Sequence, residues 1–363
     1  MELELEQFID KVSPYIIAGP CGAESEEQVL KSILPLANSS ANLIRAGIWK
    51  PRTRPNSFEG VGKVGLPWLK NAGKQINKPV CVEVANANHV QEALKAEIDV
   101  LWIGARTSVN PFLVQEIADS LKGVDIPVMV KNPVNPDLAL WLGALERFNR
   151  SGITKLAAIH RGFSTYEQII YRNKPYWQIA IDLKRIHPEL PLICDPSHMG
   201  GKRDLLLPIS QKAIDLGYNG LMIECHCSPD DALSDAKQQV TPVKLLEILN
   251  QLSYKSTYAE NPVFNDQLEA IRNEIDEIDE QLIEVIAKRM QLVKEIGKCK
   301  NEHNITIYQP QRWNHILNTR ISLGATNYLS EEFITDLYKA IHHASINEQA
   351  NVIAKNNQSN GSD

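Results

Sequence analysis

The chain has 363 residues, of which 43 % are hydrophobic and 23 % charged, a balance that excludes a largely disordered protein. Its 38 basic and 44 acidic residues leave a net charge of −6, which argues against a protein that coats nucleic acid or a membrane surface. No stretch reaches the roughly 18 apolar residues that cross a bilayer, and the acidic start MELELEQFID lacks a secretory pattern. The six scattered cysteines are therefore expected to be reduced thiols in the cytoplasm.

Short apolar runs, each followed by a helical pattern, recur along about the first 250 residues. The eight runs occupy 15–21, 41–50, 80–85, 100–106, 127–131, 155–161, 191–198 and 220–226. Continuous apolar strands that alternate with amphipathic helices indicate a parallel sheet covered by helices. Eight such units predict an α/β protein with a (β/α)₈ TIM barrel. An open doubly wound sheet is disfavoured because no GxGxxG motif follows the first run.

The composition changes after the last of these runs. We expect the barrel to occupy residues 1–253 and a polar linker ending in proline, YKSTYAENP, to occupy 254–262. An all-α domain is predicted over 263–352, and the polar end, 353–363, is predicted to be disordered.

Three helices are predicted in this second domain, over 264–301, 311–323 and 331–350. The first has apolar residues at three- and four-residue spacing from Leu268 to Leu292. At about 55 Å it is too long to be buried within its own small domain. We therefore expect it to pack against a second copy of the chain in a homodimer.

Polar residues at the carboxyl ends of the predicted strands are the first candidates for chemistry, because barrels of this kind hold their active sites there. Four strands end at or near a cation, namely Lys50, Arg106, Lys131 and Arg161. Any one of them could be an ordinary solvated charge. Four at the same end favour a site for phosphates and a carboxylate.

A second set at these ends combines a thiol, an imidazole and carboxylates. Its members are Cys21, His198, Glu224 and Asp235. This mixture of sulfur, nitrogen and oxygen suits a divalent transition metal, although a buried cysteine is more often a small apolar residue. Cys225 and Cys227 could suggest zinc, but the chain has no second pair of this kind.

Six short motifs then carry a resemblance. They are AGPCGAES (18–25), KPRT (50–53), GAR (104–106), HRG (160–162), DPSH (195–198) and ALSDAKQ (232–238). Together they resemble the type I beta 3-deoxy-D-arabino-heptulosonate 7-phosphate (DAHP) synthases over residues 14–252. The resemblance implies a (β/α)₈ barrel that condenses phosphoenolpyruvate with erythrose 4-phosphate, at the start of the shikimate pathway. The related KDO 8-phosphate synthases take arabinose 5-phosphate, and are disfavoured because they carry a KANRS-like motif in place of KPRT.

The same resemblance implies a role for each matching residue. Cys21, His198, Glu224 and Asp235 would bind a divalent metal ion, with Mn²⁺ favoured over Fe²⁺, Co²⁺ and Zn²⁺. The phosphoenolpyruvate site would consist of Arg45, Lys50, Arg106, Lys131 and Arg161, and Lys50 would also be a catalytic proton donor. Arg52 and Thr53 would contact erythrose 4-phosphate. The loops after Lys131 and Arg106 depart from the pattern of that family.

In the long helix, Arg289 falls on the apolar seam, and Lys300 projects from the same face about three turns later. Cations that cover apolar surface with their stems are the ordinary explanation. The stretch LEAIRNEIDEIDEQLIEVIAKRMQLVKEIGKCK, however, resembles the AroQ class of chorismate mutases, over about 264–350. In that class, the long helices of two chains intertwine, and each site takes one arginine from the partner chain.

That resemblance implies a chorismate site composed of Arg272 from the partner chain and Arg289, Lys300, Gln309, Arg312, Ser345 and Gln349, with Arg289 and Lys300 catalytic. Gln309 replaces a residue that is commonly acidic, and Trp313 replaces a glutamate. The domain is expected to be an active mutase or, alternatively, a non-catalytic chorismate or prephenate sensor that regulates the barrel. Because the barrel begins near residue 15, we expect feedback inhibition to act through the helical domain.

Overall fold

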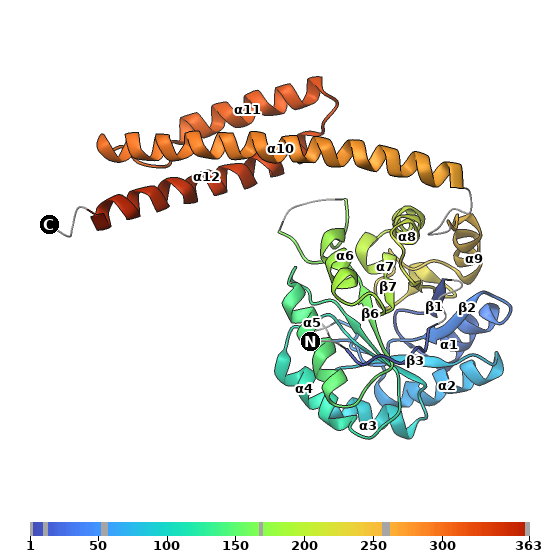
Figure 1. Ribbon diagram of the computed structural model, residues 1–363. Helices are drawn as coiled ribbons and strands as arrows, with labels where there is room; N and C mark the ends of the chain where they lie inside the picture. The colour runs from blue at the N-terminus through green and yellow to red at the C-terminus, as the bar shows by residue number, and fades with distance from the viewer. Residues whose placement is uncertain (1–2, 10–13, 52–56, 167–169, 256–261, 360–363) are drawn as a thin grey trace. The chain divides into compact units, whose positions relative to one another are not determined.

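The computed structural model describes residues 3–9, 14–51, 57–166, 170–255 and 262–359. Two compact units make up the chain, Met1–Thr257 and Tyr258–Asp363. Figure 1 shows strands ringed by helices in the first unit and helices alone in the second. None of the described helices is both long and apolar enough to cross a membrane.

The first unit is a closed barrel of eight parallel strands in sequential order, which confirms the predicted fold. The strands are β1 (Tyr15–Gly19), β2 (Ala41–Arg45), β3 (Val80–Val84), β4 (Val100–Ile103), β5 (Val128–Lys131), β6 (Leu156–His160), β7 (Leu192–Cys194) and β8 (Gly220–Glu224). The barrel closes between β1 and β8, where Gly19 lies opposite Glu224. Each strand is a short buried run because helices cover one face and the barrel interior fills the other.

Helices surround the barrel in the order expected for repeated strand–helix units (Figure 1). They are α1 (Glu26–Ile33), α2 (Gly65–Gln75), α3 (Ala87–Lys95), α4 (Pro111–Ser120), α5 (Leu138–Arg150), α6 (Trp177–Ile186), α7 (Pro196–Gly200), α8 (Leu206–Asp215) and α9 (Pro242–Gln251). Several begin at a side chain that caps the first turn, such as Ser25 before α1 and Asn86 before α3. Asp195 caps α7 in the same way, which fixes the short helix that carries His198.

Two hydrophobic layers form because alternate residues of each strand point to opposite faces. The inner layer includes Leu43, Trp102, Met129 and Met222, and all four are fully buried. The outer layer joins the other face of the strands to the surrounding helices. The inner layer fills the barrel, so polar side chains gather above it at the carboxyl ends of the strands.

The second unit consists of α10 (Pro262–Glu302), α11 (Pro310–Thr326) and α12 (Glu331–Ser359), which confirms the prediction of three helices. Helix α12 is longer than predicted, so residues 353–359 are helical where an irregular end was expected. Neither glycine nor proline occurs between Ala350 and Ser359, and the helix therefore meets no stop signal there. Residues 360–363 lie outside the described part of the chain.

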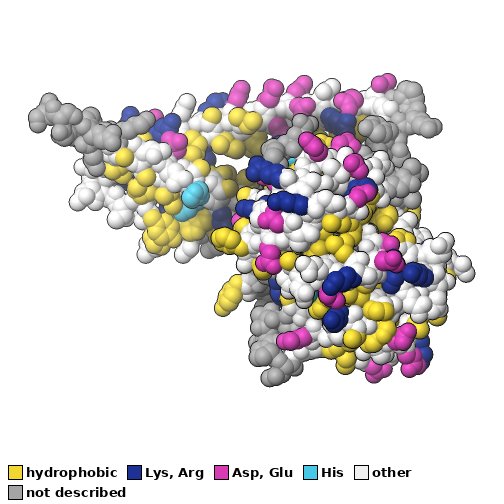
Figure 2. Space-filling view, turned by 90° about the horizontal axis from the view of Figure 1, so that it is seen from below, with side chains coloured by type: hydrophobic (Ala, Val, Ile, Leu, Met, Phe, Trp, Pro, Cys, Tyr) yellow, Lys and Arg dark blue, Asp and Glu magenta, His cyan; other side chains and the backbone are white. Residues whose placement is uncertain are grey.

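The amino-terminal half of α10 extends beyond α11 and α12 (Figure 1). Apolar side chains along this half and just beyond it are more than half exposed, at Ile271, Ile275, Ile278, Leu282 and Val285. Figure 2 shows hydrophobic side chains gathered on an exposed face of the helical unit. In contrast, Val293, in the carboxyl-terminal half of α10, is 6 % exposed. Within the helical unit, α11 and α12 thus cover only part of the apolar seam.

Candidate active sites

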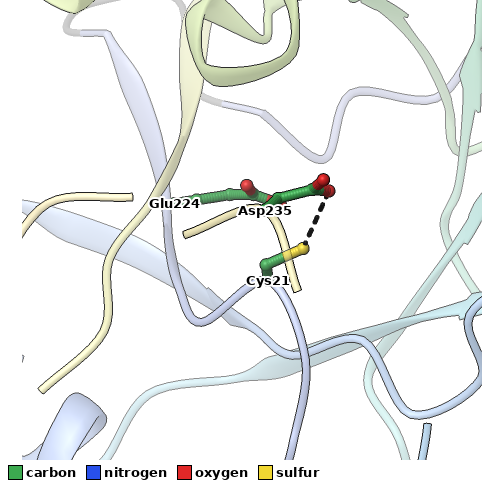
Figure 3. Close-up of side chains that lie close together, drawn as sticks. All are labelled: Cys21, Glu224 and Asp235. Carbon is green, nitrogen blue, oxygen red and sulfur yellow. Dashed lines mark hydrogen bonds between the residues drawn. The ribbon is translucent and has the colours of Figure 1, made fainter. Parts of the chain in front are cut away.

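The barrel places three of the four predicted metal ligands together. Cys21 follows β1, Glu224 ends the adjacent strand β8, and Asp235 lies in the loop after β8. Their ligand atoms all lie within 4.8 Å of one another (Figure 3). The Cys21 thiol donates a hydrogen bond to Oδ2 of Asp235 over 3.3 Å. We refer to Cys21, Glu224, Asp235 and His198 as the thiol–carboxylate cluster.

His198 lies at the edge of this cluster. Its Nε2 atom is 3.7 Å from Oε1 of Glu224 and 4.0 Å from Oδ2 of Asp235. On the other side of the ring, Oδ2 of Asp195 is 2.8 Å from Nδ1 of His198. A carboxylate at one ring nitrogen orients the other nitrogen toward a metal position. Burial lowers the pKa of His198, which favours the neutral, ligating form.

The donor set fits a divalent transition metal. Glu224 is fully buried, and its Oε1 atom accepts no hydrogen bond within the described part of the chain, although Nη2 of Arg45 is 3.2 Å away. Leaving a buried carboxylate oxygen without a partner is costly, and a cation would satisfy it. Burial and the neighbouring Glu224 raise the pKa of Cys21 to about 12, so the free site holds a thiol. A coordinated thiol loses its proton to become a thiolate ligand.

Lys50 lies directly beside the cluster. Its Nζ atom is 2.8 Å from Sγ of Cys21 and 2.9 Å from the Cys21 carbonyl oxygen. Burial opposes the charge of this ammonium group, but Cys21 and Glu224 raise its pKa above the usual value. The side chain is therefore charged where it lies beside the thiol–carboxylate cluster.

A small cavity at the barrel mouth gathers three of the predicted phosphoenolpyruvate-binding cations, Lys50, Arg106 and Arg161. Burial lowers the pKa of Arg161 to about 10, which still leaves it charged near neutral pH. Among the described residues, Arg45 and Lys131 do not line this cavity, because both are buried at its base. Lys131 pairs there with Asp195 at 2.7 Å.

Arg45 packs over the inner layer of the barrel. Its guanidinium carbon is 4.9 Å from the centre of the Trp102 ring, and Nη2 donates to the Cys21 carbonyl at 3.3 Å. Nε and Nη1 have no hydrogen-bond partner in the part of the chain that the structure describes. Arg52 and Thr53, predicted to contact erythrose 4-phosphate, lie outside the described residues.

Two further lining residues were given no role by the sequence analysis. Glu83 is the penultimate residue of β3 and accepts a hydrogen bond from Nε1 of Trp102 at 3.2 Å. Arg172 comes from the loop after β6 and donates to Asp235 at 3.1 Å. Glu83 could have been found from the sequence, because it is a polar residue near the end of the apolar run 80–85. Arg172 lies in an irregular loop, where neither periodicity nor a strand end marks it.

The helical unit contains a second cavity, of about 430 Å³. Six of the seven predicted chorismate-binding residues line it, namely Arg289, Lys300, Gln309, Arg312, Ser345 and Gln349. No aspartate or glutamate is among its described lining residues. The cavity therefore suits an anion.

Its polar groups come from both α10 and α12. Nη1 of Arg289 donates to Oγ of Ser345 at 2.8 Å, and Nζ of Lys300 donates to the Ile307 carbonyl at 2.6 Å. Gln349 is 8 % exposed, and its Oε1 atom has no partner among the described residues. Gly297 permits this approach of the helices, because a Cβ atom there would lie 3.1 Å from Cα of Gln349. The Nε2 atom of Gln349 donates to the Ser345 main-chain oxygen at 3.3 Å, so the amide oxygen is the atom available to a ligand.

Trp313, which replaces the glutamate of the resembled class, forms one wall of the cavity. Its ring stacks on His342 with centroids 4.0 Å apart, and Tyr308 meets His342 edge-on at 5.9 Å. Burial and the nearby Arg289 lower the pKa of His342, which keeps it neutral. His342 also lines the cavity and was missed, because nothing in the sequence pairs it with Trp313.

The seventh predicted residue lies elsewhere. Arg272 is an exposed residue on α10 and forms an ion pair with Glu269 on the same helix. It precedes Arg289 by about 25 Å along the helix axis. The Arg272 side chain of the same chain is not among the described residues that line the cavity.

Comparisons with known proteins find a family model that matches each unit. Residues 9–260 match the DAHP synthetase I family, and residues 271–350 match chorismate mutase type II. A phospho-2-dehydro-3-deoxyheptonate aldolase of Thermotoga maritima is 32 % identical over 237 residues, which cover 65 % of this chain and 68 % of that protein. A crystal structure of the Thermotoga maritima DAHP synthase aligns with a TM-score of 0.61 at 31 % identity, covering 67 % of this chain and 69 % of that one. A 2-dehydro-3-deoxyphosphooctonate aldolase of Legionella pneumophila is 27 % identical over 258 residues, covering 66 % of this chain and 90 % of that protein.

Proposed function

Because the chain belongs to the DAHP synthetase I family and its residues 271–350 match chorismate mutase type II, we propose that it is a bifunctional cytoplasmic enzyme. The barrel condenses phosphoenolpyruvate with erythrose 4-phosphate to give DAHP and phosphate. The helical unit converts chorismate to prephenate. The observation that carries the first activity is that the thiol–carboxylate cluster and the cation-lined cavity share one end of the barrel.

Cys21, His198, Glu224 and Asp235 would hold the metal ion, which we propose to be Mn²⁺, with Fe²⁺, Co²⁺ or Zn²⁺ as alternatives. Such an ion supplies Lewis acidity at the sugar aldehyde. Arg106, Arg161 and Lys131 bind the phosphate of phosphoenolpyruvate, and Arg45 and Lys50 lie near its carboxylate. These cations offset the repulsion between two phosphorylated substrates and fix their approach.

Lys50 carries the proton that the reaction needs. As the bond forms between C3 of phosphoenolpyruvate and the aldehyde carbon, the developing alkoxide takes a proton from Nζ of Lys50. Water then adds at C2, and phosphate leaves. Arg52 and Thr53 are proposed to hold the phosphate of the aldehyde substrate.

We expect the enzyme to release phosphate from phosphoenolpyruvate at least about tenfold faster with erythrose 4-phosphate than with arabinose 5-phosphate, because the chain carries KPRT where synthases that take arabinose 5-phosphate carry a KANRS-like motif. The measurement is kcat/KM for each aldehyde with Mn²⁺ present, and metal-stripped enzyme is the control. Faster turnover of arabinose 5-phosphate would assign the barrel to the octulosonate branch instead.

In the helical unit, Arg289 and Arg312 face the two carboxylates of chorismate, together with Arg272 from a partner chain. Lys300 stabilises the ether oxygen as its bond to carbon breaks. No covalent intermediate is required, since holding the reactive conformation and stabilising developing charge suffice for this rearrangement.

A homodimer through α10 is proposed on two grounds. The apolar seam around Ile275 and Leu282 is more than half exposed in one chain, and such a seam is ordinarily covered by another helix. Arg272 of the same chain is also too far from the cavity that it would serve. In a dimer, each cavity would receive Arg272 from its neighbour.

Mixing subunits provides a test of this sharing. Arg272→Ala and Arg289→Ala homodimers are each expected to have little mutase activity, whereas random 1:1 reassociation restores about a quarter of wild-type activity, because half the dimers are mixed and each has one intact site. Chorismate consumption after co-refolding or co-expression measures this. Two Arg289→Ala preparations mixed together are the control. Absence of any recovery would contradict the shared site.

A sensor function is the second candidate for the helical unit. Gln309 and Trp313 stand at positions that are usually acidic in the resembled class, while the cations that bind the ligand are retained. In this alternative, chorismate or prephenate binds between α10 and α12 and slows the synthase without being converted. Feedback inhibition through the same cavity is equally compatible with an active mutase.

A further inference from the structure

Asn173 connects two parts of the barrel site that are far apart in the sequence. It lies in the loop after β6, and its side chain is 5 % exposed. Its Oδ1 atom accepts a hydrogen bond from Nη1 of Arg161 at 2.7 Å. Its Nδ2 atom donates to the main-chain oxygen of His198 at 2.6 Å. The Asn173 amide thus contacts Arg161, which lines the cavity at the barrel mouth, and His198, which belongs to the thiol–carboxylate cluster.

The backbone around Asn173 is fixed on both sides. Phe163 and Lys174 exchange two main-chain hydrogen bonds of 2.8 Å, which join the segment to the end of β6. Asn173 N donates to the Met199 carbonyl at 3.1 Å, which joins it to α7. Gly162 allows the close approach: it has φ +75°, and a Cβ atom there would lie 2.6 Å from the Asn173 carbonyl oxygen.

Arg172 extends the connection to the two carboxylates of the cluster. Its Nη1 atom donates to Oδ1 of Asp235 at 3.1 Å and to Oε1 of Gln238 at 2.6 Å. Gln238 in turn donates from Nε2 to Oε2 of Glu224 at 2.7 Å. The dipeptide therefore reaches His198, Asp235 and, through Gln238, Glu224.

We propose that Arg172 and Asn173 are positioning residues that couple divalent-cation binding to phosphoenolpyruvate binding, an inference that rests on the proposed synthase function. A cation that draws His198 and the carboxylates together fixes this segment, and Asn173 then holds Arg161 in place for the phosphate. By reciprocity, the phosphate ligand must tighten cation binding by the same factor. A second connection between the two parts of the site runs through Asp195, which pairs with both Lys131 and His198. Asn173 therefore carries only part of the coupling between cation binding and phosphoenolpyruvate binding.

Two substitutions separate the two hydrogen bonds of Asn173. Asn173→Asp retains an acceptor for Arg161 and loses the donor to the His198 carbonyl. Asn173→Ala loses both. We expect Mn²⁺ to tighten phosphoenolpyruvate binding by at least about tenfold in the wild-type protein and by less than about threefold in either variant. Without Mn²⁺, we expect both variants to bind phosphoenolpyruvate more weakly, Asn173→Ala because Arg161 loses its partner and Asn173→Asp because a carboxylate beside Arg161 offsets its charge.

The experiment is isothermal titration of the full chain with phosphoenolpyruvate alone, with Mn²⁺ alone, and with each in the presence of the other. Asn219→Ala is the matched control, because Oδ1 of Asn219 also accepts hydrogen bonds but lies at the opposite end of the barrel. It is expected to lower the melting temperature and leave the coupling factor unchanged.

A coupling factor that stays at the wild-type value in a folded Asn173→Asp or Asn173→Ala protein would overturn the inference. A comparable loss of coupling in Asn219→Ala would also overturn it, since the effect would then follow from reduced stability. Wild-type protein that binds neither Mn²⁺ nor phosphoenolpyruvate would instead refute the proposed synthase function, and the inference with it.

Discussion

Replacing Cys21 with serine is expected to lower the metal-dependent condensation rate by at least about 100-fold while the barrel remains folded, since even residues that only support metal ligands cost up to that much. The thiol is fully buried, and its sulfur is 3.3 Å from Oδ2 of Asp235 and 2.8 Å from Nζ of Lys50. A serine hydroxyl does not ionise in this position, so the site loses its anionic sulfur ligand. The measurements are phosphate release at saturating Mn²⁺ and the affinity for Mn²⁺ by titration.

Cys225→Ser is the matched control for this variant. Cys225 directly follows Glu224 in the sequence and is also fully buried. Burial raises the pKa of its thiol to about 12, as it does for Cys21. It packs in the outer hydrophobic layer, away from the cluster. Both variants should therefore lose similar stability, and only Cys21→Ser should lose metal-dependent turnover. An undiminished, chelator-sensitive rate in Cys21→Ser would refute its assignment as a ligand.

Arg289→Ala is expected to reduce mutase turnover by about 100- to 1,000-fold, the range seen when one charge-stabilising donor is removed from an active site. Arg289 lines the cavity of the helical unit and donates to Ser345 at 2.8 Å. Truncation therefore removes a cation from this cavity and leaves the Ser345 hydroxyl without that donor. Chorismate consumption and prephenate formation measure the effect. The synthase rate without effector should be unchanged, because Arg289 lies outside the barrel.

The same variant separates the two functions proposed for the helical unit. Arg320→Ala, on the exposed face of α11, is the control for removing a cation from this unit. If wild-type protein converts chorismate and Arg289→Ala does not, the unit is an enzyme. If the wild type binds chorismate or prephenate without turnover, and Arg289→Ala abolishes both binding and inhibition of the synthase, the unit is a sensor. Mutase activity that survives in Arg289→Ala would contradict this cavity as the site.

Much of the fold follows from short-range patterns. The eight apolar runs predict the eight strands, because a strand buried on both faces requires a continuous run of apolar residues. Topology then places all strand ends at one rim, so polar residues such as Cys21, Glu224 and Arg161 could be predicted to meet without any distance information. The three helices of the second unit follow from spacing in the same way.

The remainder depends on tertiary packing that no local pattern encodes. Arg172 and Asn173 belong to an irregular loop, and their partners come from the residue after β6, from α7 and from the loop after β8. His342 can be recognised only beside Trp313, which lies on another helix. Arg45 and Lys131 were expected around the anion, but their depth below the cavity depends on how the inner layer is filled.

The uncovered half of α10 bears on how the two activities respond to dilution. In a homodimer, the apolar seam from Ile271 to Val285 is buried only on association, so the free energy of unfolding of the helical unit depends on protein concentration. The described residues of the barrel form hydrophobic layers within one chain, so the barrel does not need that seam to bury its core. Cellular abundance would then govern the second activity more strongly than the first, although both belong to the same polypeptide.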